Sequence, residues 1–154
     1  MMEIKKITLN SDYIEQLIEL SKIWAEEKIT VGLVPNDEAD LKEPCVAAIT
    51  NGKIVGYAFG HYYNMEKKFG EIEKGAKCFD VDEIYVLPNF RSQGIGKMLL
   101  DKLKEEVKKE ASYLTLVTST KDEKKIVHFY QEVGEMTFGY AYFYQNLNKI
   151  EEEN

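Results

Sequence analysis

The sequence has little of what marks secreted, metal-binding or membrane-spanning proteins. Its two cysteines, Cys45 and Cys78, stand in unrelated contexts, which is neither a disulfide framework nor the spacing of a metal site. No apolar run approaches the ~18 residues that a membrane-spanning helix needs, and the first residues lack the apolar stretch of a signal peptide. We therefore expect a cytoplasmic protein with no membrane partner.

Positive charge is also scarce. Lysine and arginine total 20 against 27 aspartates and glutamates, so the formal net charge is -7. General affinity for nucleic acid depends on clustered Lys and Arg, so this balance argues against a nucleic-acid partner, while an acidic surface attracts cations. The two histidines, His61 and His128, have no neighbouring ligand pattern, and no metal site is predicted.

The composition that remains is that of a globular protein, with 44% apolar and 31% charged residues. No repeat and no linker-like stretch divides the chain, so we expect a single domain over residues 1–154. Residues 11–28 place apolar side chains at helical spacing behind the cap candidates Ser11 and Asp12, and residues 36–41 suggest a second, short helix.

Strand patterns surround these helices. Two β-type runs, 45–50 and 53–63, flank Asn51-Gly52, which predicts a tight hairpin. The other expected elements are strands 2–9, 78–87 and 113–119, helices 94–110 and 122–134, and a closing aromatic strand over 137–147. Alternating strands and helices in the second half imply right-handed crossovers and some parallel pairing, hence an α/β domain.

A glycine-rich turn joins strand 78–87 to the helix that starts near Gly94. Orphan amides and the positive dipole end make a helix N-terminus an anion site. Gly94 and Gly96 let a ligand approach the backbone, and Arg91 and Lys97 can add charge to an oxygen-rich group. The turn is therefore a candidate phosphate cradle.

Two familiar phosphate loops do not fit this turn. A P-loop needs G-x-x-x-x-G-K-[ST], but Arg91 stands five before Gly96 and Met98 follows Lys97. The dinucleotide fingerprint needs a third glycine where Leu99 stands. Glycine spacing alone therefore does not say whose phosphate the turn holds.

The wider stretch "VLPNFRSQGIGKMLL" resembles the acetyl-CoA signature of the GNAT superfamily of N-acetyltransferases. Arg91, Gly94 and Gly96 fit its three defined positions, and "HFYQEVG" at 128–134 is similar to a second segment of that superfamily. The sequence departs from that superfamily's pattern at two positions. Glu135 stands where an aromatic residue usually follows the segment, and Ile126 stands where a small residue is usual. These departures bear on packing and on the class of acceptor. The element order also resembles the GNAT fold, which implies a central mixed sheet of six to seven strands, splayed at the signature and flanked by about four helices.

The resemblance implies acetyl-CoA as co-substrate, no metal, and direct attack of an amine on the thioester. Tyr130 occupies the position of the acid that protonates the leaving thiolate, and no nucleophilic cysteine is required. The pantetheine arm would pair with a strand end, as in β-augmentation. The implied cofactor-binding residues are Ile84, Tyr85 and Val86 for pantetheine, and Arg91, Ser92, Gln93, Gly94, Ile95, Gly96 and Lys97 for the pyrophosphate.

The base has three candidates on one strand. Side chains alternate along a strand, which places Asp80 and Asp82 on one face and Glu83 on the other with Phe79 and Val81, unless a bulge intervenes. Apolar surroundings would raise the pKa of Glu83, as a base near neutral pH requires. The resemblance instead aligns Asp82 with the proposed base of polyamine acetyltransferases and Asp80 with that of histone acetyltransferases, so all three stay open.

These observations predict an N-acetyltransferase that acts on a primary amine of a small cationic molecule. Acetylation of a protein or peptide amine, and a non-catalytic acyl-CoA-binding module, are the alternatives. The resemblance places His61 beside the acceptor, where it is a candidate substrate contact. The aromatic closing strand 137–147 is a candidate homodimer contact, although core packing would also account for it.

Overall fold

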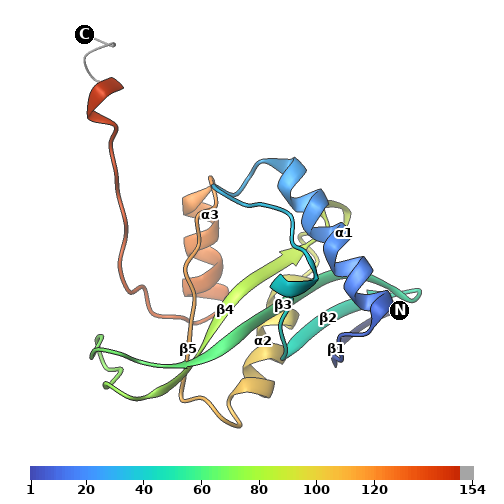
Figure 1. Ribbon diagram of the computed structural model, residues 1–154, viewed down its shortest axis with the longest axis horizontal. Helices are drawn as coiled ribbons and strands as arrows, with labels where there is room; N and C mark the ends of the chain where they lie inside the picture. Colours follow the sequence, from blue (N-terminus) through green and yellow to red (C-terminus); the bar gives the residue numbers. More distant parts are fainter. Residues whose placement is uncertain (150–154) are drawn as a thin grey trace.

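The structure of the protein is a computed structural model, which describes residues 1–149. A mixed five-stranded sheet runs through its centre in the order β1-β2-β3-β4-β5, with the strands antiparallel except for the parallel pair β4-β5 (Figure 1). The strands are β1 Met2–Ile7, β2 Cys45–Thr50, β3 Lys53–Asn64, β4 Lys77–Val86 and β5 Tyr113–Thr115.

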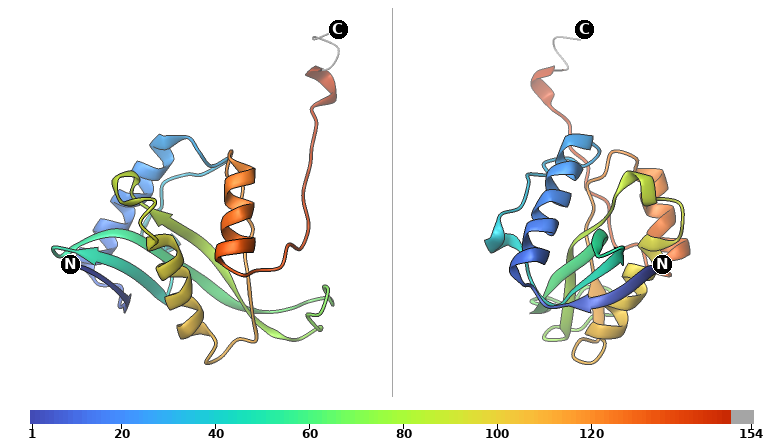
Figure 2. Two further views of the ribbon diagram at one scale, coloured as in Figure 1. Left: turned by 180° about the vertical axis from the view of Figure 1, so that it is seen from behind. Right: turned by 90° about the vertical axis from the view of Figure 1, so that its right-hand side faces the viewer.

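Helices cover both faces of this sheet (Figure 2). Helix α1, Ser11–Glu27, packs on one face against a core that includes Tyr57 and Phe59, and α2, Ile95–Val107, packs on the other against Phe79 and Val81. Further helical elements are α3 Glu123–His128, the π-helical turn Phe129–Val133 that continues it, and 3-10 turns at Glu38–Asp40 and Pro88–Phe90. Within residues 1–149, none of the helices has the length and apolar character needed to cross a bilayer.

The first helix begins one residue earlier than the cap candidates suggested. The side chain of Asn10 accepts a hydrogen bond from the amide of Tyr13 at 2.9 Å, so Asn10 is the N-cap in place of Ser11 or Asp12. The hairpin prediction is confirmed, since Asn51 and Gly52 both have positive φ, 51° and 74°, between β2 and β3.

The pairing of β3 with β4 contains a bulge that changes the faces predicted for the acidic residues. Phe59 pairs with Glu83 but Gly60 pairs with Val81, so Asp82 is an extra residue on β4. A Cβ on Gly60 would lie 1.9 Å from the carbonyl oxygen of Asp80, so the close approach requires glycine. The face prediction for Glu83 is wrong: past the bulge, Glu83 shares the face of Asp80, the one opposite α2.

The sheet has fewer strands than the six to seven expected. Residues 137–147 form no strand: Tyr140 meets the ring of Phe69 edge-on, and the segment beyond it runs away from the body of the molecule (Figures 1 and 2). Tyr142, Phe143 and Tyr144 are 84%, 88% and 82% exposed. High β-propensity does not make a strand unless the backbone finds an edge to pair with.

The strand expected over 113–119 is also shorter, because its second half leaves β4. Instead of pairing with the sheet, residues 117–121 meet the loop after α1. The amide of Val31 donates to the carbonyl of Ser119 at 3.0 Å, and Thr30 forms an isolated bridge with Thr120. This contact joins the loop after α1 to the segment that precedes α3.

Candidate active site

The glycine-rich turn ends as an open helix N-terminus. Gly94 is the N-cap of α2 with φ 80°, and Ser92 also has positive φ, 62°. The first helical hydrogen bond runs from the amide of Met98 to the carbonyl of Gly94 at 3.1 Å. Within residues 1–149 the amides of Ile95, Gly96 and Lys97 have no protein acceptor, which suits the oxygens of a phosphate.

The two cationic side chains of this turn, Arg91 and Lys97, pair with other groups of the protein. Arg91 donates two hydrogen bonds of 2.7 Å to the carboxylate of Glu27 and a third, from Nε, to the carbonyl of Val86 at 2.9 Å. Its guanidinium also lies over the ring of Tyr85. Lys97 pairs with Asp101 along the helix surface. The candidate phosphate cradle therefore consists of backbone amides. The charge of Arg91, which was expected to face a ligand, instead fixes the turn through its ion pair with Glu27.

Glu27, the last residue of α1, was not singled out by the sequence. Burial raises its pKa, but hydrogen bonds from Arg91 and from the Tyr85 hydroxyl outweigh that effect and leave the pKa below its usual range. The ring of Tyr85 stacks on Trp24 at 4.9 Å. An acid at the end of an amphipathic helix carries no sequence signal for such a role, because its partner lies 64 positions away.

The splayed strands expected from the resemblance are present. Strand β5 pairs with β4 only from Cys78 to Asp80, and beyond that point the two strands part. Residues 84–86 pair with β3 on one side and have no strand partner on the other within residues 1–149. An unpaired strand edge suits a ligand that carries amides, such as pantetheine.

Glu83 lies past the parting point and is the most enclosed of the three acids. One of its carboxylate oxygens accepts hydrogen bonds from the hydroxyl of Tyr57 at 2.8 Å and from the side-chain amide of Asn36 at 2.9 Å. Burial raises the pKa of Glu83, and the nearby charges of Asp82 and Asp40 raise it further. The direction matches the sequence argument, but the enclosing residues are not the ones it named.

The other two acids occupy the parting point itself. Asp80 accepts a hydrogen bond from Thr115 at 2.8 Å, and burial raises its pKa. Asp82 pairs with Nδ1 of His61 at 2.9 Å and with the ammonium of Lys42 at 3.1 Å. The three acids therefore lie at and just beyond the fork between β4 and β5, each with a different set of partners.

Tyr130 is in the π-helical turn, next to the start of α2. A Cβ on Gly96 would lie 3.3 Å from the ring of Phe129, so that turn packs directly on the glycine-rich turn. Burial raises the pKa of Tyr130 to about 12. The phenol therefore stays protonated at neutral pH, which is the state that a proton donor requires.

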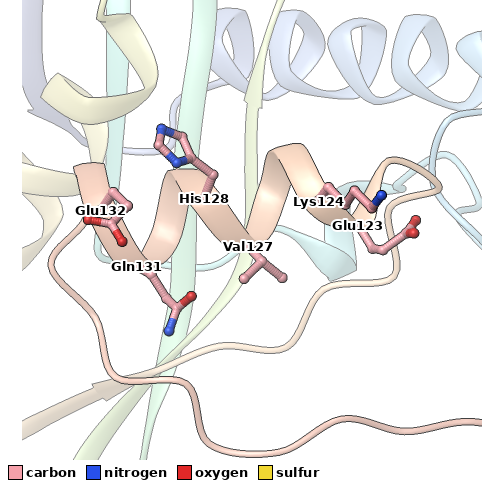
Figure 3. A pocket seen from close by; sticks show the side chains of 6 residues that line it. All are labelled: Glu123, Lys124, Val127, His128, Gln131 and Glu132. Carbon is pink, nitrogen blue, oxygen red and sulfur yellow. The ribbon is translucent and has the colours of Figure 1, made fainter.

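A surface depression lies elsewhere, along α3. It has a volume of about 400 Å³ and follows the outer side of α3 (Figure 3). Its lining side chains are those of Glu123, Lys124, Val127, His128, Gln131 and Glu132. None of the three acids or the signature-turn residues takes part in it, so we do not assign it to the reaction.

The chain matches a protein-family model over most of its length. The family model described as "Acetyltransferase (GNAT) family" matches residues 11–134. Comparison with curated protein sequences gives no match.

Solved structures share the fold at low sequence identity. An aminoglycoside acetyltransferase from an uncultured soil metagenomic sample, solved with sisomicin, is 20% identical with a TM-score of 0.67, covering 95% of this chain and 96% of that one. The aminoglycoside N-acetyltransferase AAC(6')-Iy, solved with CoA, is 20% identical with a TM-score of 0.63 over 94% and 98%. A ribosomal-protein-alanine N-acetyltransferase from Brucella melitensis is 19% identical with a TM-score of 0.63 over 96% and 99%.

The matched family segment spans both α1 and the π-helical turn, and so includes the glycine-rich turn, the fork and Tyr130. The open amides of α2 and the unpaired edge of β4 suit the phosphates and amides of CoA. The chain belongs to the GNAT acetyltransferase family and is an acyltransferase that uses acetyl-CoA as its co-substrate.

Proposed function

We propose that the protein transfers the acetyl group of acetyl-CoA to a primary amine of a small cationic molecule. The observation that carries this proposal is the grouping of Asp80, Asp82 and Glu83 at the fork between β4 and β5, on the sheet face opposite α2. A cationic amine is attracted to such a group, and the net charge of -7 favours its approach. Two of the similar structures are aminoglycoside acetyltransferases, which is consistent with this class.

The proposed roles fall into cofactor binding and proton transfer. Backbone amides from Ser92 to Lys97 hold the pyrophosphate, and the free edge of residues 84–86 holds the pantetheine arm. The ammonium must lose a proton before the neutral amine can attack the thioester carbonyl, and the side chains gathered around Asp82 and Glu83 remove that proton, directly or through a relay. As the carbon–nitrogen bond forms and the carbon–sulfur bond breaks, Tyr130 gives a proton to the departing sulfur.

The direct test is release of free CoA thiol from acetyl-CoA in the presence of a panel of amines. We expect turnover with polyamines, aminoglycosides or amino-acid amines, and a peptide library run beside them tests the peptide alternative. Turnover on peptides alone would replace the small-cation proposal, and the similar ribosomal-protein acetyltransferase is the reason to include that arm. CoA binding without turnover on any acceptor would favour a non-catalytic binding module.

We also propose that residues 137–147 pair with a second copy of the chain. This arm exposes six large apolar residues, more than a soluble surface ordinarily carries in one segment. The outer edge of β5 has no strand partner within residues 1–149. Pairing of the arm with the β5 edge of another copy would cover both surfaces. The exposed residues are Phe138, Tyr140, Tyr142, Phe143, Tyr144 and Leu147.

A further inference from the structure

One side chain at the fork has a geometry that the proposed roles do not use. His61 lies on β3, directly across from Asp80, and the bulge turns Asp82 toward its ring. Both carboxylate oxygens of Asp82 lie within 3.1 Å of Nδ1 of His61. The imidazole side chain is 45% exposed, on the sheet face opposite α2 where the acids gather.

The pairing with Asp82 fixes which ring nitrogen carries the proton. An ionised carboxylate can only accept hydrogen bonds, so Nδ1 of His61 must be the donor. In the neutral ring the lone pair then belongs to Nε2, for which residues 1–149 provide no hydrogen-bond partner. This nitrogen is free to accept a proton from a substrate.

The three acids are less free than His61 to accept that proton. One oxygen of Glu83 already holds two donors, and Asp80 accepts from Thr115. Asp82 holds both His61 and the ammonium of Lys42. The groups that face the imidazole are thus Asp82 and Asp80 on β4, Tyr63 on its own strand and Lys42 on the loop before β2.

We propose that His61 removes a proton from the substrate ammonium and that Asp82 is a positioning residue that acts through His61. Nε2 takes a proton from the ammonium, the neutral amine attacks the carbonyl carbon, and the imidazolium later releases its proton to solvent. After the attack the substrate nitrogen loses a second proton, which replaces the proton that Tyr130 gives to sulfur. The products are the acetylated amine, the free thiol of CoA and one proton. This inference rests on the proposed acetyl transfer and names the group that serves it.

Three variants and their controls test the assignment through kinetics. His61→Gln should lower kcat/KM by about 10²-fold, without changing acetyl-CoA affinity, and remove the acid limb of the pH profile. The defect should shrink with an acceptor amine that is already neutral at the assay pH, because no proton then has to be removed. Asp82→Asn should lower the rate less than His61→Gln does, whereas Glu83→Gln should leave the acid limb in place. His128→Gln, on the outer side of α3, is the matched control and should match the wild type.

A measurement without turnover covers the case in which a variant fails to fold. The chain has two histidines, so the His128→Gln protein carries a single imidazole for nitrogen NMR. We expect the neutral ring of His61 to be protonated at Nδ1, and Asp82→Asn to mix the two tautomers. A ring protonated at Nε2, or a His61→Gln enzyme with wild-type rate and pH profile, would overturn the inference. A wild type that turns over no acceptor would instead contradict the proposed function.

Discussion

The guanidinium of Arg91 and the carboxylate of Glu27 form a two-bonded ion pair, with both nitrogen–oxygen distances at 2.7 Å. The pair joins the last residue of α1 to the residue that precedes the glycine-rich turn. A third bond from Arg91 to the carbonyl of Val86 fixes the end of β4 as well. One side chain therefore sets the relative positions of α1, the end of β4 and the glycine-rich turn.

Glu27→Gln should lower the free energy of unfolding by about 1–2 kcal/mol, a modest value because Arg91 is 35% exposed and solvent screens the pair. The pKa of Glu27 is lower in the folded protein than its ordinary value near 4.5. This contribution is therefore present above that value and is lost as the pH falls through the folded pKa. Urea unfolding at several pH values should show the variant approaching the wild type under acid conditions.

The control for that prediction is Glu73→Gln, which removes an exposed ion pair with Lys68 and should change stability very little at any pH. A wild-type-like urea midpoint for Glu27→Gln at neutral pH would contradict the assigned role of the pair.

Tyr130→Phe should reduce kcat by about 10²-fold while the affinity for acetyl-CoA is kept, because the hydroxyl is needed only as the thiolate leaves. The pKa of Tyr130 is raised to about 12 by burial, so its ionisation should produce no alkaline loss of activity below about pH 10. Steady-state kinetics with free-thiol detection and calorimetric titration with CoA measure the two effects separately. Tyr13→Phe on α1 is the matched control, and a variant with unchanged kcat would remove Tyr130 from the mechanism.

Gly60→Ala should destabilise the protein by more than about 3 kcal/mol, because its Cβ would lie 1.9 Å from the carbonyl oxygen of Asp80 in a backbone that cannot yield cheaply. Gly52→Ala is the comparison: its φ is 74° but no atom lies within 4 Å of the added carbon, so the cost is backbone strain of about 1 kcal/mol. Thermal and urea unfolding of both proteins check the difference, and equal losses would argue against a bulge at Gly60.

Removal of residues 137–154 should leave residues 1–136 folded and monomeric, because the arm contributes none of the buried core residues. The full-length chain should sediment as a dimer at micromolar concentration. A shorter truncation that removes only residues 150–154 keeps the arm and should keep the dimer. A full-length protein that remains monomeric would indicate that the arm folds back on its own β5 edge instead.

Much of the fold follows from local sequence pattern. Helical spacing of apolar residues predicted α1 and α2, and Asn51-Gly52 predicted the hairpin, because these signals act between residues close in the chain. The prediction of a strand at 137–147 was wrong because it too rested on a local signal. Its aromatic residues favour extended backbone, but whether an edge is available to pair with is decided by distant parts of the chain.

The candidate site divides in the same way. The motif of Arg91, Gly94 and Gly96 predicted a turn that opens a helix N-terminus, since a helix start with open amides is a local structure. The acids were found by sequence as well, but not their faces, because one unpaired residue at Asp82 reverses the alternation.

Local sequence pattern was thus enough to identify the family, the co-substrate and the stretch of β4 that carries the acids. The pairing of Arg91 with Glu27 in place of a ligand, and of Asp82 with His61, became visible only in the folded protein. Both partnerships join residues far apart in the chain. The physical reason is that a side chain's partner is set by which elements pack together, and no periodicity or spacing encodes that contact.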